Sequence, residues 1–207
     1  MDKRLFTSKW LWAALILSII SFLVRLSGMD WGFPAILHSD ESNVVRSSLG
    51  MRFGDLNPHH FDWPSLYFYI NYFVFMGFIK FRVLLQILFS TEIMQKTFPF
   101  WWEPDLPFYY ISRIITSIFL SLNIITVYFL AKGYGLSSKL SFLSALVFSI
   151  GVLTNYFSFY GISDTALTFF ITLTSYFCIK ILKEGKLSDY AFAGIFAGLA
   201  TSIKYNA

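Results

Sequence analysis

Five long apolar segments constrain this chain more than any other feature of its sequence. They consist mostly of Leu, Ile, Phe, Val, Ala and Ser, and they cover residues 10–27, 109–131, 140–157, 165–182 and 190–203. A helix needs about 20 mostly apolar residues to cross the hydrocarbon core of a bilayer. Only 14% of the 207 residues are charged, compared with about 25% in a typical soluble domain. The sequence therefore predicts an all-α fold, a polytopic bundle of about five transmembrane helices.

The positions of the basic residues predict the orientation of this bundle. Lysine and arginine favour the cytoplasmic ends of membrane helices, and here they flank the first segment and two short loops, as Lys3, Arg4, Lys9, Lys132, Lys139, Lys180, Lys183 and Lys186. A further apolar segment, 65–79, is interrupted early by Lys80 and Arg82. All these basic residues fall on the cytoplasmic side only if 65–79 does not cross the membrane. The sequence thus predicts a cytoplasmic N-terminus and one long extracytoplasmic loop, 28–108, with interfacial or re-entrant helices at 65–90.

The composition also excludes several classes of protein. The single cysteine, Cys178, cannot form an intramolecular disulfide, and the histidines and carboxylates have no spacing typical of a metal site. No cofactor is identified, and a divalent metal has no support from ligand spacing. The formal charge of +4 comes from scattered residues that form no basic patch, so a nucleic-acid partner is not expected.

Ionisable residues gather in the segments predicted to face outward. Asp40 and Glu41 follow the first apolar segment, and Arg113 opens the next one. The long loop adds His59 and His60, while Asp164 ends the second outer loop. Ionisable groups near membrane depth are costly and suggest function. A carboxylate can accept a proton from an acceptor group, and an arginine can hold a phosphate through two hydrogen bonds.

Each of these residues also has a structural interpretation. The Asp40–Glu41 pair is compatible with a solvated loop, and Asp164 with a helix N-cap. Arg25 and Arg113 are placed where long cationic side chains reach toward lipid headgroups. His59 and His60 are compatible either with ordinary polar loop residues or with residues that bind substrate by contacting the acceptor.

The order of these features resembles the membrane glycosyltransferases of the C-type fold. The order is a first helix ending in an arginine, the Asp-Glu pair, the stretch "GDLNPHHFDWPSLYFY", an arginine at the next span and an aspartate in the following short loop. It is most similar to the bacterial relatives of the dolichyl-phosphate-mannose protein mannosyltransferases, which include the aminoarabinose transferases of lipid A. The resemblance extends from about Leu15 to Ala207.

This resemblance implies a function and a set of site residues. The expected activity is sugar transfer from a polyprenyl-phosphate donor, usually with inversion, to an extracytoplasmic lipid, glycan or protein acceptor. It implies that Asp40 is the general base or orients the acceptor, with Glu41 as its companion acid. It further implies that Arg113 contacts the donor phosphate and that Asp164 faces the same cavity. Lys204 matches a lysine after the fifth span.

The resemblance also makes the chain, 1–207, a single N-terminal transmembrane module of a longer protein, located in a bacterial-type inner membrane. The competing hypotheses are a polytopic transporter and a non-catalytic membrane subunit. A transporter would show internal repeats and paired broken helices, and no repeat is visible in the sequence. The stretch 81–107 has no predicted role.

Overall fold

The computed structural model describes residues 8–205, and every regular element in this part of the chain is a helix. The helices are α1 (Lys9–Leu26), α2 (Ser39–Gly50), α3 (Leu66–Leu88), α4 (Thr91–Thr97), α5 (Pro99–Trp102), α6 (Leu106–Gly133), α7 (Ser138–Ile150), α8 (Val152–Phe157), α9 (Asp164–Glu184) and α10 (Leu187–Thr201). The prediction of an all-α fold is confirmed. Lys3 and Arg4, on which the predicted orientation partly depends, lie outside the described residues.

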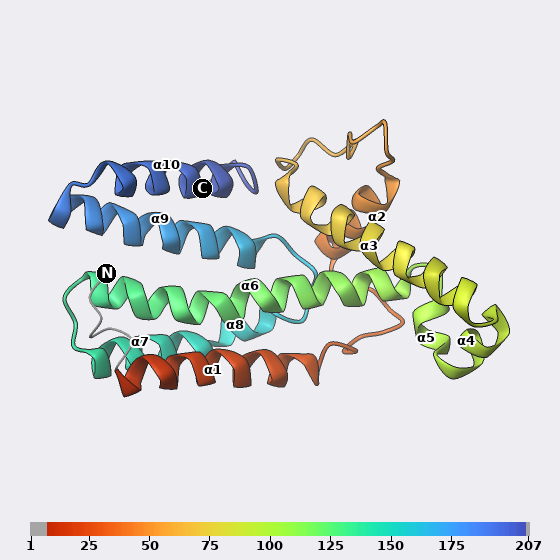
Figure 1. Cartoon of the computed structure of the whole chain (residues 1–207), viewed down its shortest axis with the longest axis horizontal. Helices are drawn as coiled ribbons and strands as arrows, with labels where there is room; N and C mark the ends of the chain where they lie inside the picture. Colours follow the sequence, from red (N-terminus) through yellow and green to blue (C-terminus); the bar gives the residue numbers. More distant parts are fainter. Residues whose placement is uncertain (1–7, 206–207) are drawn as a thin grey trace.

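The bundle is built around α6. Helix α6 packs against α1, α7 and α9, and α10 packs on the outer side of α9 (Figure 1). Polar side chains are buried in these contacts; for example, the Ser18 hydroxyl of α1 donates to the backbone carbonyl of Ser121 on α6 at 2.6 Å. Small residues and interhelical hydrogen bonds are the usual means of helix association in lipid. By length and composition, α1, α3, α6 and α9 are each able to cross a membrane.

The two ends of the bundle differ in charge. Lys183 donates to the Gly133 carbonyl, and Lys180 pairs with Asp189, so the end of α9 lies beside the end of α6 and the start of α10. Figure 1 shows the start of α1 and of α7 at this same end. The lysine-flanked segments within the described residues are therefore together, as the sequence predicts. The opposite end holds the loops predicted to face outward and the candidate site residues.

The segment between α1 and α6 carries four helices. Helix α3 continues unbroken past Lys80 and Arg82 to Leu88, and by length and composition it could cross a membrane. A cationic side chain on an apolar helix does not interrupt the backbone hydrogen bonds of that helix. Figure 1 shows α3 running obliquely across the end of the bundle, with α2 near its start and α4 and α5 near its far end. Its predicted interfacial position stays a prediction.

The predicted span 140–157 is interrupted in the structure. Gly151 has a ψ of 130°, which ends α7 and begins the short helix α8. The Asn155 side-chain amide donates to the carbonyls of Ser149 and Gly151 at 3.1 and 2.9 Å, which satisfies acceptors that a helix end leaves free.

The sequence predicts that Arg25 reaches the membrane interface, but in the structure it stabilises the same break. Its guanidinium donates to the Asn155 side-chain oxygen at 3.0 Å and to the Ser21 hydroxyl, and the residue is only 2% exposed. A buried arginine requires such hydrogen-bond partners within the protein.

Candidate functional site

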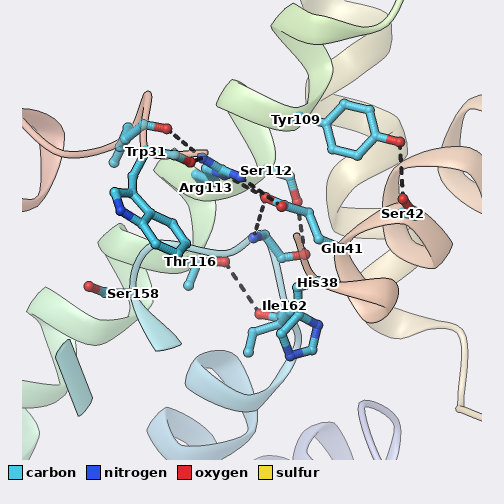
Figure 2. A network of polar contacts seen from close by, with 12 residues as sticks. Trp31, His38, Glu41, Ser42, Tyr109, Ser112, Arg113, Thr116, Ser158 and Ile162 are labelled. Atoms are coloured by element: carbon cyan, nitrogen blue, oxygen red, sulfur yellow. Dashed lines mark hydrogen bonds and ion pairs between the residues drawn. The ribbon is translucent and has the colours of Figure 1, made fainter. Parts of the chain in front are cut away.

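A buried ion pair joins α2 to α6 at the end of the bundle opposite the lysines. Nε and Nη2 of Arg113 donate to Oε1 and Oε2 of Glu41 at 2.6 and 2.8 Å, in the bidentate geometry drawn in Figure 2. Both side chains are 0% exposed. A buried charge is costly unless it is paired and fully hydrogen-bonded, so each of these residues requires the other. Glu41, predicted to be the companion acid of Asp40, and Arg113, predicted to contact the donor phosphate, are both shielded from solvent here.

The remaining donors of Arg113 hold the segment that follows α1. Its Nη1 donates to the carbonyls of Met29 and Trp31 at 2.7 and 2.8 Å. The guanidinium also lies 4.0 Å from the centre of the Phe33 ring, which is a favourable cation–π distance. Arg113 therefore connects the end of α1, the start of α2 and the outer half of α6.

The loop between α8 and α9 attaches to the same ion pair. The Gly161 N–H donates to Oε1 of Glu41 at 2.8 Å, and the Ser112 hydroxyl donates to the Gly161 carbonyl at 3.3 Å. A Cβ at position 161 would lie 2.4 Å from the Ser112 hydroxyl oxygen, so only glycine fits. One turn along α6, the Thr116 hydroxyl donates to the Ile162 carbonyl at 3.3 Å (Figure 2). Together these contacts fix the position of the second outer loop.

Asp40 has a different environment from its neighbour Glu41. Consecutive residues of a helix point in different directions, and Asp40 is partly exposed whereas Glu41 is buried. The side chain of His38 caps α2, because its Nδ1 accepts the Asp40 N–H at 3.2 Å. Asp40 lies in the first turn of α2, where the helix dipole favours a negative charge. The geometry thus presents one accessible carboxylate on a helix that a buried ion pair holds in place.

Asp164 and Lys204 form a second ion pair at this end of the bundle. Nζ of Lys204 lies 2.8 and 2.9 Å from the two carboxylate oxygens of Asp164. Their side chains are 40% exposed for Asp164 and 20% for Lys204. Asp164 is the first residue of α9 and Ser163 is its N-cap, so the capping interpretation of Asp164 is wrong. The pair is open to solvent and its cation remains near the surface.

The loop that precedes α3 covers this second pair. Lys204 Nζ lies 5.8 Å from the centre of the Trp63 ring, and the Leu66 N–H donates to the Ser202 carbonyl at 3.0 Å. His60 packs against Trp63 with their ring centres 5.0 Å apart. The "HHFDW" stretch and Lys204, which are far apart in the sequence, are therefore neighbours.

His59 and His60 do not act as a pair. His59 is exposed, has a φ of 50°, and its Nε2 lies 3.3 Å from Oδ2 of Asp55. The backbone N–H of Asn57, and then His59, lower the pKa of the Asp55 carboxyl. The His60 ring packs instead against the rings of Trp63 and Phe68. Within residues 8–205, no group of three His, Cys, Asp or Glu side chains is placed to hold a metal ion.

Sequence reasoning missed two residues whose rings lie beside the ion pair, His38 and Tyr160. The His38 ring lies 4.9 Å from the ring of Tyr160, and Trp31 packs on the edge of Tyr160 at 5.9 Å. Burial raises the pKa of Tyr160 to about 12. His38 precedes the Asp-Glu pair by two residues, which is a sequence signal for a cap, whereas no local signal marks Tyr160.

Comparison with known proteins gave one match. A family model for dolichyl-phosphate-mannose-protein mannosyltransferases matches residues 111–207, from α6 through α10. No curated protein and no solved structure matches the chain significantly. The matched part contains Arg113, Asp164 and Lys204, and the Asp-Glu pair lies before it.

Proposed function

Because this chain is a relative of the dolichyl-phosphate-mannose-protein mannosyltransferases over residues 111–207, we propose that it transfers a sugar from a polyprenyl phosphate to an extracytoplasmic acceptor. The observation that carries the proposal is the contrast within the Asp-Glu pair. Asp40 is accessible, while the neighbouring Glu41 is buried and fixed by Arg113. A reactive carboxylate gains from such a rigid support, since catalysis depends on accurate positioning.

In the proposed reaction Asp40 is the general base. It accepts the proton of an acceptor hydroxyl or amine as that atom attacks the anomeric carbon of the donor sugar. The bond between this carbon and the phosphate oxygen breaks, and the polyprenyl phosphate leaves with the bonding electrons. A positioned base of this kind contributes roughly 100- to 10,000-fold to a rate.

The structure changes the proposed role of Arg113. Its guanidinium donates four hydrogen bonds to Glu41 and to two backbone carbonyls, so we assign Arg113 and Glu41 as positioning residues. A leaving phosphate still needs a cation. Lys204 supports this role best, because it is partly exposed and lies at the same end of the bundle. Asp164 then holds the ammonium group in place between turnovers.

The loop around His60 and Trp63 is proposed to contact the acceptor. Trp63 covers Lys204, and aromatic faces are common in sugar and lipid sites. His59, which is exposed and paired with Asp55, is assigned to the outer edge of this surface. The site would then lie at the extracytoplasmic face of a plasma membrane, with the lysine-rich end inside.

The test is the variant Asp40→Asn in the full chain. Membranes containing the protein are supplied with labelled polyprenyl-phosphate mannose and polyprenyl-phosphate aminoarabinose, and release of polyprenyl phosphate and labelling of the acceptor are measured. We expect Asp40→Asn to lower turnover by about 100-fold or more without changing the melting temperature. Glu103→Gln, which removes an exposed carboxylate of the same predicted loop away from the His60 and Trp63 surface, is the matched control and should keep full activity.

Two results would overturn the proposal. Turnover that is equal in Asp40→Asn and in the unaltered chain would exclude Asp40 as the base. Movement of the intact donor across the membrane, without release of polyprenyl phosphate, would favour the transporter hypothesis.

A further inference from the structure

The segment with no predicted role, 81–107, forms one wall of an apolar groove. The groove has a volume of about 860 Å³ and lies between α3, the short helices α4 and α5, and the outer half of α6. Its wall is aromatic and aliphatic, with Phe78 and Phe81 on α3, Trp101 on α5 and Ile111 on α6. This volume is within the usual range for ligand sites, about 300–1,000 Å³.

The apolar wall of the groove contains one cationic residue, Arg82. Arg82 is the only charged residue lining the groove, and within residues 8–205 no carboxylate pairs with it. Its guanidinium lies 5.2 Å from the Trp102 ring centre and 5.8 Å from that of Phe78. These rings hold the guanidinium beside the groove and leave its hydrogen-bond donors free.

A second polar group in the groove also lacks a partner. Nε1 of Trp102 is buried and makes no hydrogen bond. Buried donors are nearly always satisfied, so an unpaired one calls for a partner such as a water molecule or an ion. The unpaired guanidinium lies over the Trp102 ring, 5.2 Å from its centre, and the guanidinium and the indole N–H can each donate a hydrogen bond to an oxyanion.

We propose that the groove binds an anionic membrane phospholipid, with an acyl chain along the apolar wall and the phosphate at Arg82 and Trp102. The apolar wall matches a hydrocarbon chain, and the two donors match a phosphate. Large apolar side chains around the groove, including Phe81 and Phe89, are exposed, so a lipid can enter from the side.

The groove is separate from the site proposed for the reaction. None of its lining residues belongs to the Glu41–Arg113 network or to the Asp164–Lys204 pair. Arg82 lies 14 residues beyond Phe68, where the Ser48 hydroxyl fastens α2 to α3, which is about 21 Å along a helix. Figure 1 shows α4 and α5 beside the far end of α3, away from α9 and α10. The proposed phosphate position at Arg82 is therefore distant from the point where α2, which carries Asp40, attaches to α3, and this favours a membrane phospholipid over the sugar donor.

The experiment measures lipid binding to the purified full chain in detergent by native mass spectrometry. The probes are dioleoylphosphatidylglycerol, dioleoylphosphatidylcholine and undecaprenyl phosphate. The variants are Arg82→Met, which keeps an apolar stem, and Gly77→Leu, which fills the groove. Gly77 lines the groove and a Cβ there meets nothing within 4 Å, so Gly77→Leu should fold. Lys80→Met, on the same helix but outside the groove, is the matched charge control.

We expect one tightly bound phosphatidylglycerol, preferred over phosphatidylcholine by about tenfold or more. Arg82→Met should remove this preference, Gly77→Leu should weaken both phospholipids, and Lys80→Met should change neither. Equal binding of the two phospholipids, or an unchanged preference in Arg82→Met, would overturn the assignment. Stronger, Arg82-dependent binding of undecaprenyl phosphate would also overturn it, since the groove would then belong to the donor.

Discussion

The substitution Glu41→Gln tests the central structural claim, that a buried ion pair holds the candidate site together. In the altered chain Arg113 stays in the interior with its backbone partners Met29 and Trp31 but without a counter-charge. Removing one partner of a buried pair costs about 3–5 kcal/mol. For a chain of this length, this free-energy loss corresponds to a fall in melting temperature of roughly 6–20 °C.

The assay is thermal unfolding of the detergent-solubilised chain, followed by size-exclusion chromatography. Asp40→Asn is the matched control, because it neutralises the adjacent carboxylate of the same helix and should cost less than about 1 kcal/mol. The double variant Glu41→Gln/Arg113→Met should be at least about 1 kcal/mol more stable than the sum of the single variants predicts. A melting temperature of Glu41→Gln equal to that of Asp40→Asn, or strict additivity in the double variant, would refute the reasoning.

Two further predictions concern the loop at the site and the orientation of the chain. Gly161→Ala should lower stability by roughly 1–3 kcal/mol, because its Cβ would overlap Ser112; Gly198→Ala, where a Cβ meets nothing within 4 Å, should raise stability by up to about 1 kcal/mol. Thermal unfolding distinguishes the two variants. Equal changes in stability would show that the loop at Gly161 can move away from Ser112 without cost. Single cysteines at Ser90 and Ser137, in a cysteine-free background, should differ in labelling by an impermeant thiol reagent applied from outside. We expect the reagent to label only the cysteine that replaces Ser90. Labelling of the cysteine that replaces Ser137 would contradict the proposed orientation.

Most of the helical architecture could be predicted from the sequence. The apolar segments 10–27, 109–131, 165–182 and 190–203 each correspond to one helix, because the hydrocarbon core demands long apolar runs whatever their partners. The break at Gly151 was not predicted. It depends on Arg25 and Asn155, whose partners lie on other helices or across the break, and hydropathy does not record such contacts.

The sequence also identified the residues of the candidate site but not what each of them contacts. It placed Asp40, Glu41 and Arg113 at one end of the bundle, because the lysines fix which helix ends lie together. Only the tertiary structure separated the accessible Asp40 from the buried Glu41. The physical reason is that helix rotation is set by packing, and a rotation by one residue would exchange their environments.

Composition and periodicity thus determined that this chain is an all-helical bundle with helices able to span a membrane, with its ionisable residues gathered at one end. The tertiary structure alone decided that Arg113 binds a carboxylate and two carbonyls of its own chain, leaving Lys204 near the surface beside Asp164. Pairing between residues 72 positions apart, as for Glu41 and Arg113, depends on which helix faces pack together. Local sequence specifies that each helix forms, whereas these pairings are fixed only when the helices pack.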